Sequence, residues 1–321
     1  MSSANAALPA AASHPHPGIW AHLKTAGRLL YRAGIAWNRD NAMRLSAAVA
    51  MYTILSLSPL LVITIKVMSL ILGEEAAGGQ VRRQVEALLG PLGAKAVEGM
   101  IANTVKPGAG VLATILSVVM LVYTASGVFN ELRDSLNAVW RVQPKTGRGI
   151  WAALRDRLLS VGMVFVIGFL LLVSQLVSVT LTVMSQFVFG DTGWAAVAVD
   201  FAVSAVVVTI LFAALFRVLP DAKLSWREVL FGSVVTAVLF KVGQFLLSLY
   251  FTYGTTASAY GAAGSFVVVL LWVYYSCWIL FYGAELIQER CELFGRRIEP
   301  SDDAVKVDDD AEKQWHGKQP K

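Results

Sequence analysis

Six long apolar stretches constrain this chain more than any other feature of its sequence. Each comes close to or exceeds the roughly 20 residues that a helix needs to cross a hydrocarbon core about 30 Å thick. Because lipid offers no hydrogen-bond partners to a bare backbone, we expect all six to be helices. Charges, Gly and Pro separate the predicted spans, which are 45–72, 111–129, 158–188, 194–219, 229–251 and 265–287.

Composition excludes an ordinary soluble domain. The chain is 56% hydrophobic and 15% charged, with a mean hydropathy of +0.60, whereas soluble domains carry about 25% charged residues. The expected fold class is therefore all-α: a polytopic membrane protein with six transmembrane helices.

The basic residues predict the topology. With six spans, 21 Lys and Arg fall on the side that holds both termini and four fall on the other, while Lys66 and Lys241 lie within spans. The positive-inside rule then places the N-terminus and the C-terminus in the cytoplasm. The net charge of +5 is explained by this asymmetry, so we expect no nucleic acid among the partners.

The segments outside the spans have distinct patterns. Residues 1–18 lack an apolar core and are expected to be a disordered tail. Residues 19–38 form an amphipathic pattern that fits either a helix on the membrane surface or one packed against the bundle. The membrane domain is expected to cover 19–292, with a helical outer loop at 73–110, a basic loop at 130–156 and a charged, disordered tail at 293–321.

Two side chains of opposite charge are predicted at mid-depth. Lys241 lies about 12–15 residues into the fifth span from its cytoplasmic end, which is roughly 20 Å at 1.5 Å per residue, and Asp200 lies at a similar depth in the fourth span. Charges within the membrane are costly and often functional. We expect these two to pair or to share one polar cavity, either as a structural ion pair or on a transport path.

Other polar groups within the spans are weaker candidates. Ser56 and Ser58 precede Pro59, which should kink the first span and free a carbonyl for a hydroxyl. Glu285, near the cytoplasmic end of the last span, is expected to pair with Arg44, Arg133 or Arg217. Lys66 is expected to extend toward the outer surface, and the remaining candidates at intermediate depth are Gln175 and Gln244.

The motifs of soluble enzymes are absent from the sequence. There is no P-loop, G-x-S-x-G, C-x-x-C or H-E-x-x-H pattern, and the histidines lie outside the predicted spans, at positions 14, 16, 22 and 316. We therefore expect no catalytic residues, no metal site and no cofactor. A chain of this kind is not expected to hydrolyse ATP by a P-loop mechanism.

Short motifs in a fixed order resemble the YihY/virulence factor BrkB family of bacterial inner-membrane proteins, over about 35–288. The motif residues are Arg44, Asn130, Asn137, Trp140, Arg217, Pro220, Tyr260, Gly261, Gly283 and Glu285. The resemblance implies a six-helix inner-membrane protein. Members have been linked to serum resistance and, for some relatives, to export of lipid A precursors. Members have also been labelled ribonuclease BN, a label that this chain does not favour because clustered metal ligands are missing.

Two functions remain open from the sequence. The first is a transporter or flippase that moves a lipid or another amphiphile. The alternative is a non-catalytic scaffold that holds the partners of an envelope complex; a nuclease is disfavoured. Membrane lipids and envelope proteins are the expected partners. No G-x-x-x-G face predicts a dimer, so the oligomeric state stays open.

Overall fold

A computed structural model describes residues 19–73, 111–145, 193–253 and 264–307, together with the isolated positions 79, 82, 86, 95, 98–99 and 162. Its helices are α1 (Ile19–Arg39), α2 (Ala42–Leu72), α4 (Val111–Val139), α6 (Gly193–Val218), α7 (Trp226–Tyr253) and α9 (Gly264–Leu293). Four short strands accompany them: β1 (Val142–Pro144), β2 (Ala222–Lys223), β3 (Glu299–Pro300) and β4 (Ala304–Lys306).

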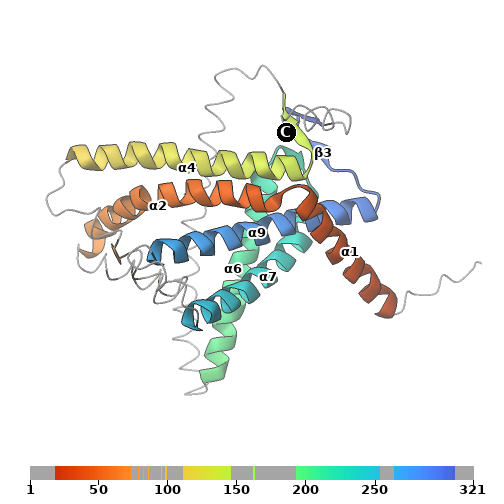
Figure 1. The fold of residues 1–321 in the computed structure, drawn as a ribbon, viewed down its shortest axis with the longest axis horizontal. Helices are drawn as coiled ribbons and strands as arrows, with labels where there is room; N and C mark the ends of the chain where they lie inside the picture. The colour runs from red at the N-terminus through yellow and green to blue at the C-terminus, as the bar shows by residue number, and fades with distance from the viewer. Residues whose placement is uncertain are drawn as a thin grey trace, which may run out of the picture.

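The long helices form a bundle in which α2 packs against both α4 and α9 (Figure 1). Helix α7 packs on the other side of α9 and also contacts α6, which crosses the bundle steeply in Figure 1. The buried core lies where these helices meet and includes Leu136, Phe216 and Phe281. The starts of α2 and α7, the ends of α4, α6 and α9, and the four strands share one end, called the basic end below because Arg133, Arg217 and Arg296 lie there.

Five of the six predicted spans correspond to described helices. Of span 158–188 only position 162 is described, and Gln175 lies outside the described residues. In the part of the chain that the structure describes, three helices are long and apolar enough to cross a membrane: Phe201–Val218, Trp226–Leu247 and Phe266–Leu293. Ala42–Leu57 is a shorter apolar helix. The chain is thus a mostly helical membrane protein. In the expected outer loop 73–110, the described positions from 79 to 99 are helical, whereas position 73 is not, and Arg82 lies 3.5 Å from Glu98.

Helix α4 is longer than the sequence suggested. The expected loop at 130–156 is wrong for its first ten residues, because α4 continues to Val139. Its buried residues Phe129, Leu132 and Leu136 recur at helical spacing, and Trp140 follows them at 1% exposure. A helix whose apolar stripe packs on neighbouring helices is stabilised by that packing, whatever charges its other face carries.

The charged tail is a second correction. The expected disorder from residue 293 is wrong as far as Val307, and the fold is not purely α-helical. Strand β4 pairs with β1 in antiparallel register, Val142 opposite Lys306, and β3 pairs with β2, Ala222 opposite Pro300. The tail's charged residues predicted solvation, but its backbone hydrogen bonds are satisfied by strands that follow α4 and α6. Residues 308–321 and 1–18 lie outside the description.

Helices α7 and α9 approach closely through glycines. A Cβ placed on Gly283 would lie inside van der Waals contact of the Thr236 hydroxyl, and one placed on Gly243 would overlap the Tyr275 ring. The two pairs occur in opposite order along the helices, as antiparallel neighbours require. Small residues allow such close backbone approach between membrane helices.

Helix α1 packs on the bundle through its second half. Leu29 and Ala33 are buried against Leu286 of α9, and the Trp37 indole donates a hydrogen bond to the Trp278 carbonyl at 3.3 Å. Packing against the bundle, one of the two expectations for this helix, is therefore confirmed. The opposite face of α1 exposes Tyr31. Whether this face lies on the membrane surface stays a prediction.

Candidate functional site

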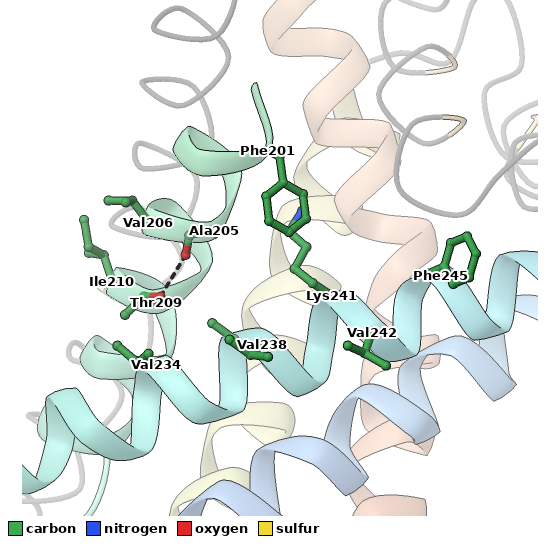
Figure 2. A pocket seen from close by; sticks show the side chains of 11 residues that line it. Phe201, Ala205, Val206, Thr209, Ile210, Val234, Val238, Lys241, Val242 and Phe245 are labelled. Atoms are coloured by element: carbon green, nitrogen blue, oxygen red, sulfur yellow. Dashed lines mark hydrogen bonds between the residues drawn. The ribbon is translucent and has the colours of Figure 1, made fainter. Parts of the chain in front are cut away.

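A groove lies between α6 and α7 and is lined by side chains of both helices (Figure 2). It encloses about 590 Å³, within the range of roughly 300–1,000 Å³ typical of small-molecule sites. The lining residues are Phe201, Ala205, Val206, Thr209 and Ile210 of α6 and Val234, Ala237, Val238, Lys241, Val242 and Phe245 of α7.

The groove follows from how the two helices cross. The connection through β2 joins the end of α6 to the start of α7, so the helices run in opposite directions. Apolar side chains at positions 206 and 210 and at 234, 238, 242 and 245 stay 46–67% exposed, because they line the open side of the crossing. The Thr209 hydroxyl donates to the Ala205 carbonyl at 2.8 Å, which leaves an almost entirely apolar surface.

Lys241 brings a positive charge into this apolar groove. It lies about 22 Å along α7 from Trp226, at 1.5 Å per residue, and its side chain extends toward the first turns of α6, beside Phe201. The ammonium nitrogen donates a hydrogen bond to the Ser204 hydroxyl at 2.5 Å. The side chain is partly buried, and a buried charge is costly unless it is hydrogen-bonded or paired.

The structure does not test the pairing of Lys241 with Asp200. Asp200 lies in α6 one turn before Ser204, on the same helix face, because residues four apart are neighbours on a helix. Its side chain is not among those described, so the ion pair stays a prediction.

Asp221 is a buried charge that the sequence analysis missed. The Arg133 guanidinium binds its carboxylate in two places, at 3.0 Å and 2.6 Å, and the Asn137 amide donates to it at 2.9 Å. The Asp221 amide donates in turn to the Asn137 side chain at 2.8 Å, and its carbonyl accepts from Ser301. This cluster ties α4, the α6–α7 connection and the tail together. Its sequence signal was weak, because Asp221 follows the span in a segment that looks like an ordinary charged turn.

The expected partners of Glu285 are wrong. The charged groups that act on its carboxyl are Asp40, Arg39 and Glu289, because the turn between α1 and α2 folds against α9. Arg133 binds Asp221 instead, Arg217 donates to the Leu224 carbonyl, and the Arg44 side chain is exposed. Glu285 itself is 0% exposed.

The remaining polar candidates have local roles where they are described. Ser56 donates to the Thr53 carbonyl of its own helix at 2.8 Å, rather than to the carbonyl that Pro59 frees. Helix α2 continues through Pro59, and the kink stays a prediction. The side chains of Ser58, Pro59 and Lys66 are outside the description, and Gln244 is half buried.

The motif residues divide into buried and exposed groups. Those that are buried are Asn137, Trp140, Pro220, Gly283 and Glu285, whereas Arg44 and Asn130 are exposed and Arg217 is intermediate. The Trp140 indole donates to the Ala284 carbonyl at 3.3 Å, which joins α4 to α9. Tyr260 and Gly261 lie outside the described ranges. Most of these residues hold the basic end together, away from the groove.

No group of three or more His, Cys, Asp or Glu side chains that could hold a metal is found among the described residues. The groove also contains no pair of described titratable groups set up for acid–base chemistry. What the arrangement can do is bind: an apolar chain against the two helices and a polar or acidic group at Lys241.

A protein-family model described as Virulence factor BrkB matches residues 35–305. The chain is 27% identical over 266 residues to a UPF0761 membrane protein of Pseudomonas aeruginosa; the match covers 81% of the chain and 61% of that relative's length. It is also 28% identical to UPF0761 membrane proteins of Idiomarina loihiensis (59% of the chain, 66% of the relative) and Aliivibrio salmonicida (74% of each). No solved structure matches significantly.

Proposed function

Since the chain belongs to the virulence factor BrkB family, we propose that it transports or flips a lipid or a similar amphiphile through the groove between α6 and α7. The groove, with Lys241 among its lining residues, is the observation that carries the proposal. The activity is the movement of a bound molecule and involves no covalent step. The relatives extend beyond the segment that matches this chain. The proposal therefore concerns this chain and is not extended to the relatives.

The groove has the shape and surface for an apolar chain. Its open side is lined by Val, Ile and Phe side chains on both helices, and burying such surface against a ligand stabilises the complex by about 25 cal/mol per Å². A scaffold has no need for a cavity between two helices. A lipid chain that lies between α6 and α7 would replace contacts that the crossing leaves unmade.

The positive charge of Lys241 indicates which chemical group the polar end of the ligand carries. An ammonium at this depth is costly to hold, and a negatively charged or strongly polar group beside it lowers that cost. The proposed ligand is therefore an amphiphile whose chain lies along Val234, Val238 and Val242 and whose acidic group meets Lys241. Asp200, if it pairs with Lys241 as predicted, would release the ammonium to the incoming ligand.

The proposal places the protein in the bacterial inner membrane, with its basic end and both termini in the cytoplasm. The basic residues at this end can also attract anionic lipid headgroups of the cytoplasmic leaflet. Such attraction would raise the local concentration of an acidic lipid near the groove.

Mass spectrometry of lipids that remain bound to the gently purified protein tests the proposal. We compare the wild type with Lys241→Met, which keeps the length of the side chain but not its charge, and with Lys223→Met, a matched control in β2 outside the groove. A charged hydrogen bond contributes about 1.5–3 kcal/mol, so Lys241→Met should weaken retention of an acidic lipid by about tenfold or more.

A second pair of variants tests the groove itself. Val238→Trp fills the groove from an exposed position, whereas Val218→Trp places the same side chain on an exposed part of α6 that does not line it. Retention lost in the first and kept in the second supports the proposal. Equal retention of bulk lipids by all variants would overturn it and would favour the scaffold, for which cross-linking would then identify envelope partners.

A further inference from the structure

Two arginines and an exposed tryptophan lie where α6 ends and α7 begins. Arg217 is the last residue but one of α6, and Trp226 is the first residue of α7. The Arg217 guanidinium lies over the Trp226 ring, 5.6 Å from its centroid, and donates a hydrogen bond to the Leu224 carbonyl. Arg227 follows Trp226 and is exposed. These contacts hold the Arg217 side chain in place beside an exposed aromatic ring.

The same residues lie at the ends of two candidate membrane spans. The spans within α6 and α7 are Phe201–Val218 and Trp226–Leu247, so Arg217 and Trp226 are each within one residue of a span end. Tryptophan is enriched at the boundary between membrane and water, because its ring is amphipathic. Lipid headgroups occupy the layer just outside the hydrocarbon core. A headgroup at this boundary would therefore lie at the level of both side chains.

The exposed face of α7 continues from Trp226 into the groove. Trp226 and Leu230 are 58% and 49% exposed. Val234 and Val238 follow at the same spacing of four residues and line the groove (Figure 2). Because residues four apart are neighbours on a helix, these four side chains form one apolar stripe, about 18 Å long at 1.5 Å per residue. A lipid with its headgroup at Trp226 would lay its chains along this stripe.

The charge at this end favours an anion. Asp221 and Glu228, the acidic residues nearest in sequence, are buried and paired with other arginines. Within the described ranges, neither Arg217 nor Arg227 forms an ion pair with a carboxylate. The Leu224 carbonyl takes one of the five N–H donors of the Arg217 guanidinium. The geometry of a guanidinium matches phosphate oxygens, which it binds through two parallel hydrogen bonds.

We propose that Arg217, Trp226 and Arg227 form a binding site for the phosphate headgroup of an anionic lipid, whose chains lie along the stripe on α7. Basic pockets between transmembrane helices are suited to such headgroups. A soluble phosphate would meet the same arginines but would leave the stripe uncovered. The use of this site to load the groove rests on the proposed function, whereas headgroup binding does not.

Native mass spectrometry of the full-length protein, titrated with phosphatidylglycerol or with phosphatidylcholine of the same chains, tests the site. Every protein in the series carries Lys241→Met, so that an acidic-lipid site at Lys241 does not contribute. The parent should prefer phosphatidylglycerol, and Arg217→Gln should reduce this preference by about tenfold or more. Arg28→Gln removes an exposed arginine from α1; it is the matched control and should leave the preference unchanged.

Two further variants separate binding from folding. Arg217→Gln also changes the α6–α7 connection, because it removes the bond to the Leu224 carbonyl. Arg227→Gln and Trp226→Leu alter exposed side chains, so they should each reduce the preference by roughly twofold to fivefold without lowering the thermal stability. An unchanged preference in all three variants would overturn the proposal. Equally tight binding of glycerol phosphate, which has no chains, would overturn the assignment to a lipid.

The result is separable from that of the proposed function. If Lys241→Met alone leaves lipid retention unchanged while Arg217→Gln removes the preference, the transport proposal fails and the headgroup site stands. If Lys241→Met lowers retention but the preference survives all three variants of the headgroup site, only the headgroup site is refuted.

Discussion

Substitution of Gly283 by Ala should separate α7 from α9 and thereby destabilise the bundle. The added Cβ would lie inside contact distance of the Thr236 hydroxyl, 3.0 Å from Thr236 Cβ and 3.1 Å from Thr236 Cγ2. The hydroxyl cannot simply rotate away without loss, because it donates to the Gly232 carbonyl at 2.6 Å. One of the two helices must shift.

The magnitude follows from two opposing terms. Forcing extra methylene volume into a packed interface costs about 1–3 kcal/mol, whereas replacing Gly by Ala within a helix gains about 0.5–1 kcal/mol. We expect Gly283→Ala to lower the free energy of unfolding by about 1–2 kcal/mol. Thr236→Ala removes the hydroxyl and the methyl group that the new Cβ would meet, so the double variant should recover about 1 kcal/mol or more relative to the sum of the two single variants.

Reversible SDS-induced unfolding in bicelles, followed by tryptophan fluorescence, measures these differences. Gly34→Ala is the matched control, since a Cβ at Gly34 of α1 meets nothing within 4 Å; it should stabilise the protein by up to about 1 kcal/mol. If Gly283→Ala proves as harmless as Gly34→Ala, or if Gly283→Ala and Thr236→Ala are additive, the close contact between α7 and α9 does not exist as described.

Three further outcomes are expected. Asp221→Ala removes the carboxylate that binds the Arg133 guanidinium in a mostly buried site, and thermal unfolding should show a loss of about 3–5 kcal/mol. Lys223→Ala removes only an exposed charge and should change stability little. The Lys223 ammonium lowers the pKa of the exposed Asp302 carboxyl, mainly through a hydrogen bond. Stability from this pair should therefore be present above the ordinary carboxyl pKa and be lost as pH falls through the lowered one, with protection of the β2–β3 amides from hydrogen exchange as the measurement. The Asp302 carboxylate raises the pKa of Lys223, so the same protection should also be lost as pH rises through that raised value; Lys223→Met should abolish both limbs.

Predictions from the sequence were confirmed where a single physical effect, the transfer of apolar groups into lipid, dominates. The predicted spans other than 158–188 differ from the described helices by a few residues, except at the end of α4, because length and hydropathy are enough to define a helix in lipid. The resemblance to the BrkB family was confirmed by the family match over residues 35–305. Lys241 was singled out by its depth alone, and it lines the groove; its functional role and its pairing with Asp200 stay predictions.

Prediction failed where distant segments decide the environment of a charge. Residues of the tail carry the charges of a solvated segment, yet β3 and β4 pair with strands that follow other helices. Glu285 was assigned to arginines near it in depth, but depth does not say which helix is adjacent. Asp221 was not singled out, because nothing local distinguishes a buried carboxylate from one in a turn.

The sequence by itself determined that this chain is a membrane protein of long apolar helices with its basic residues gathered at one end, because transfer of apolar and charged groups between water and lipid depends on residue type and order alone. Only the tertiary structure decided which carboxylate meets which guanidinium, how closely α7 approaches α9, and where two helices part to leave a groove beside Lys241. Those features depend on the relative placement of segments far apart in the chain, and their energies arise from short-range packing and desolvation that no single segment contains.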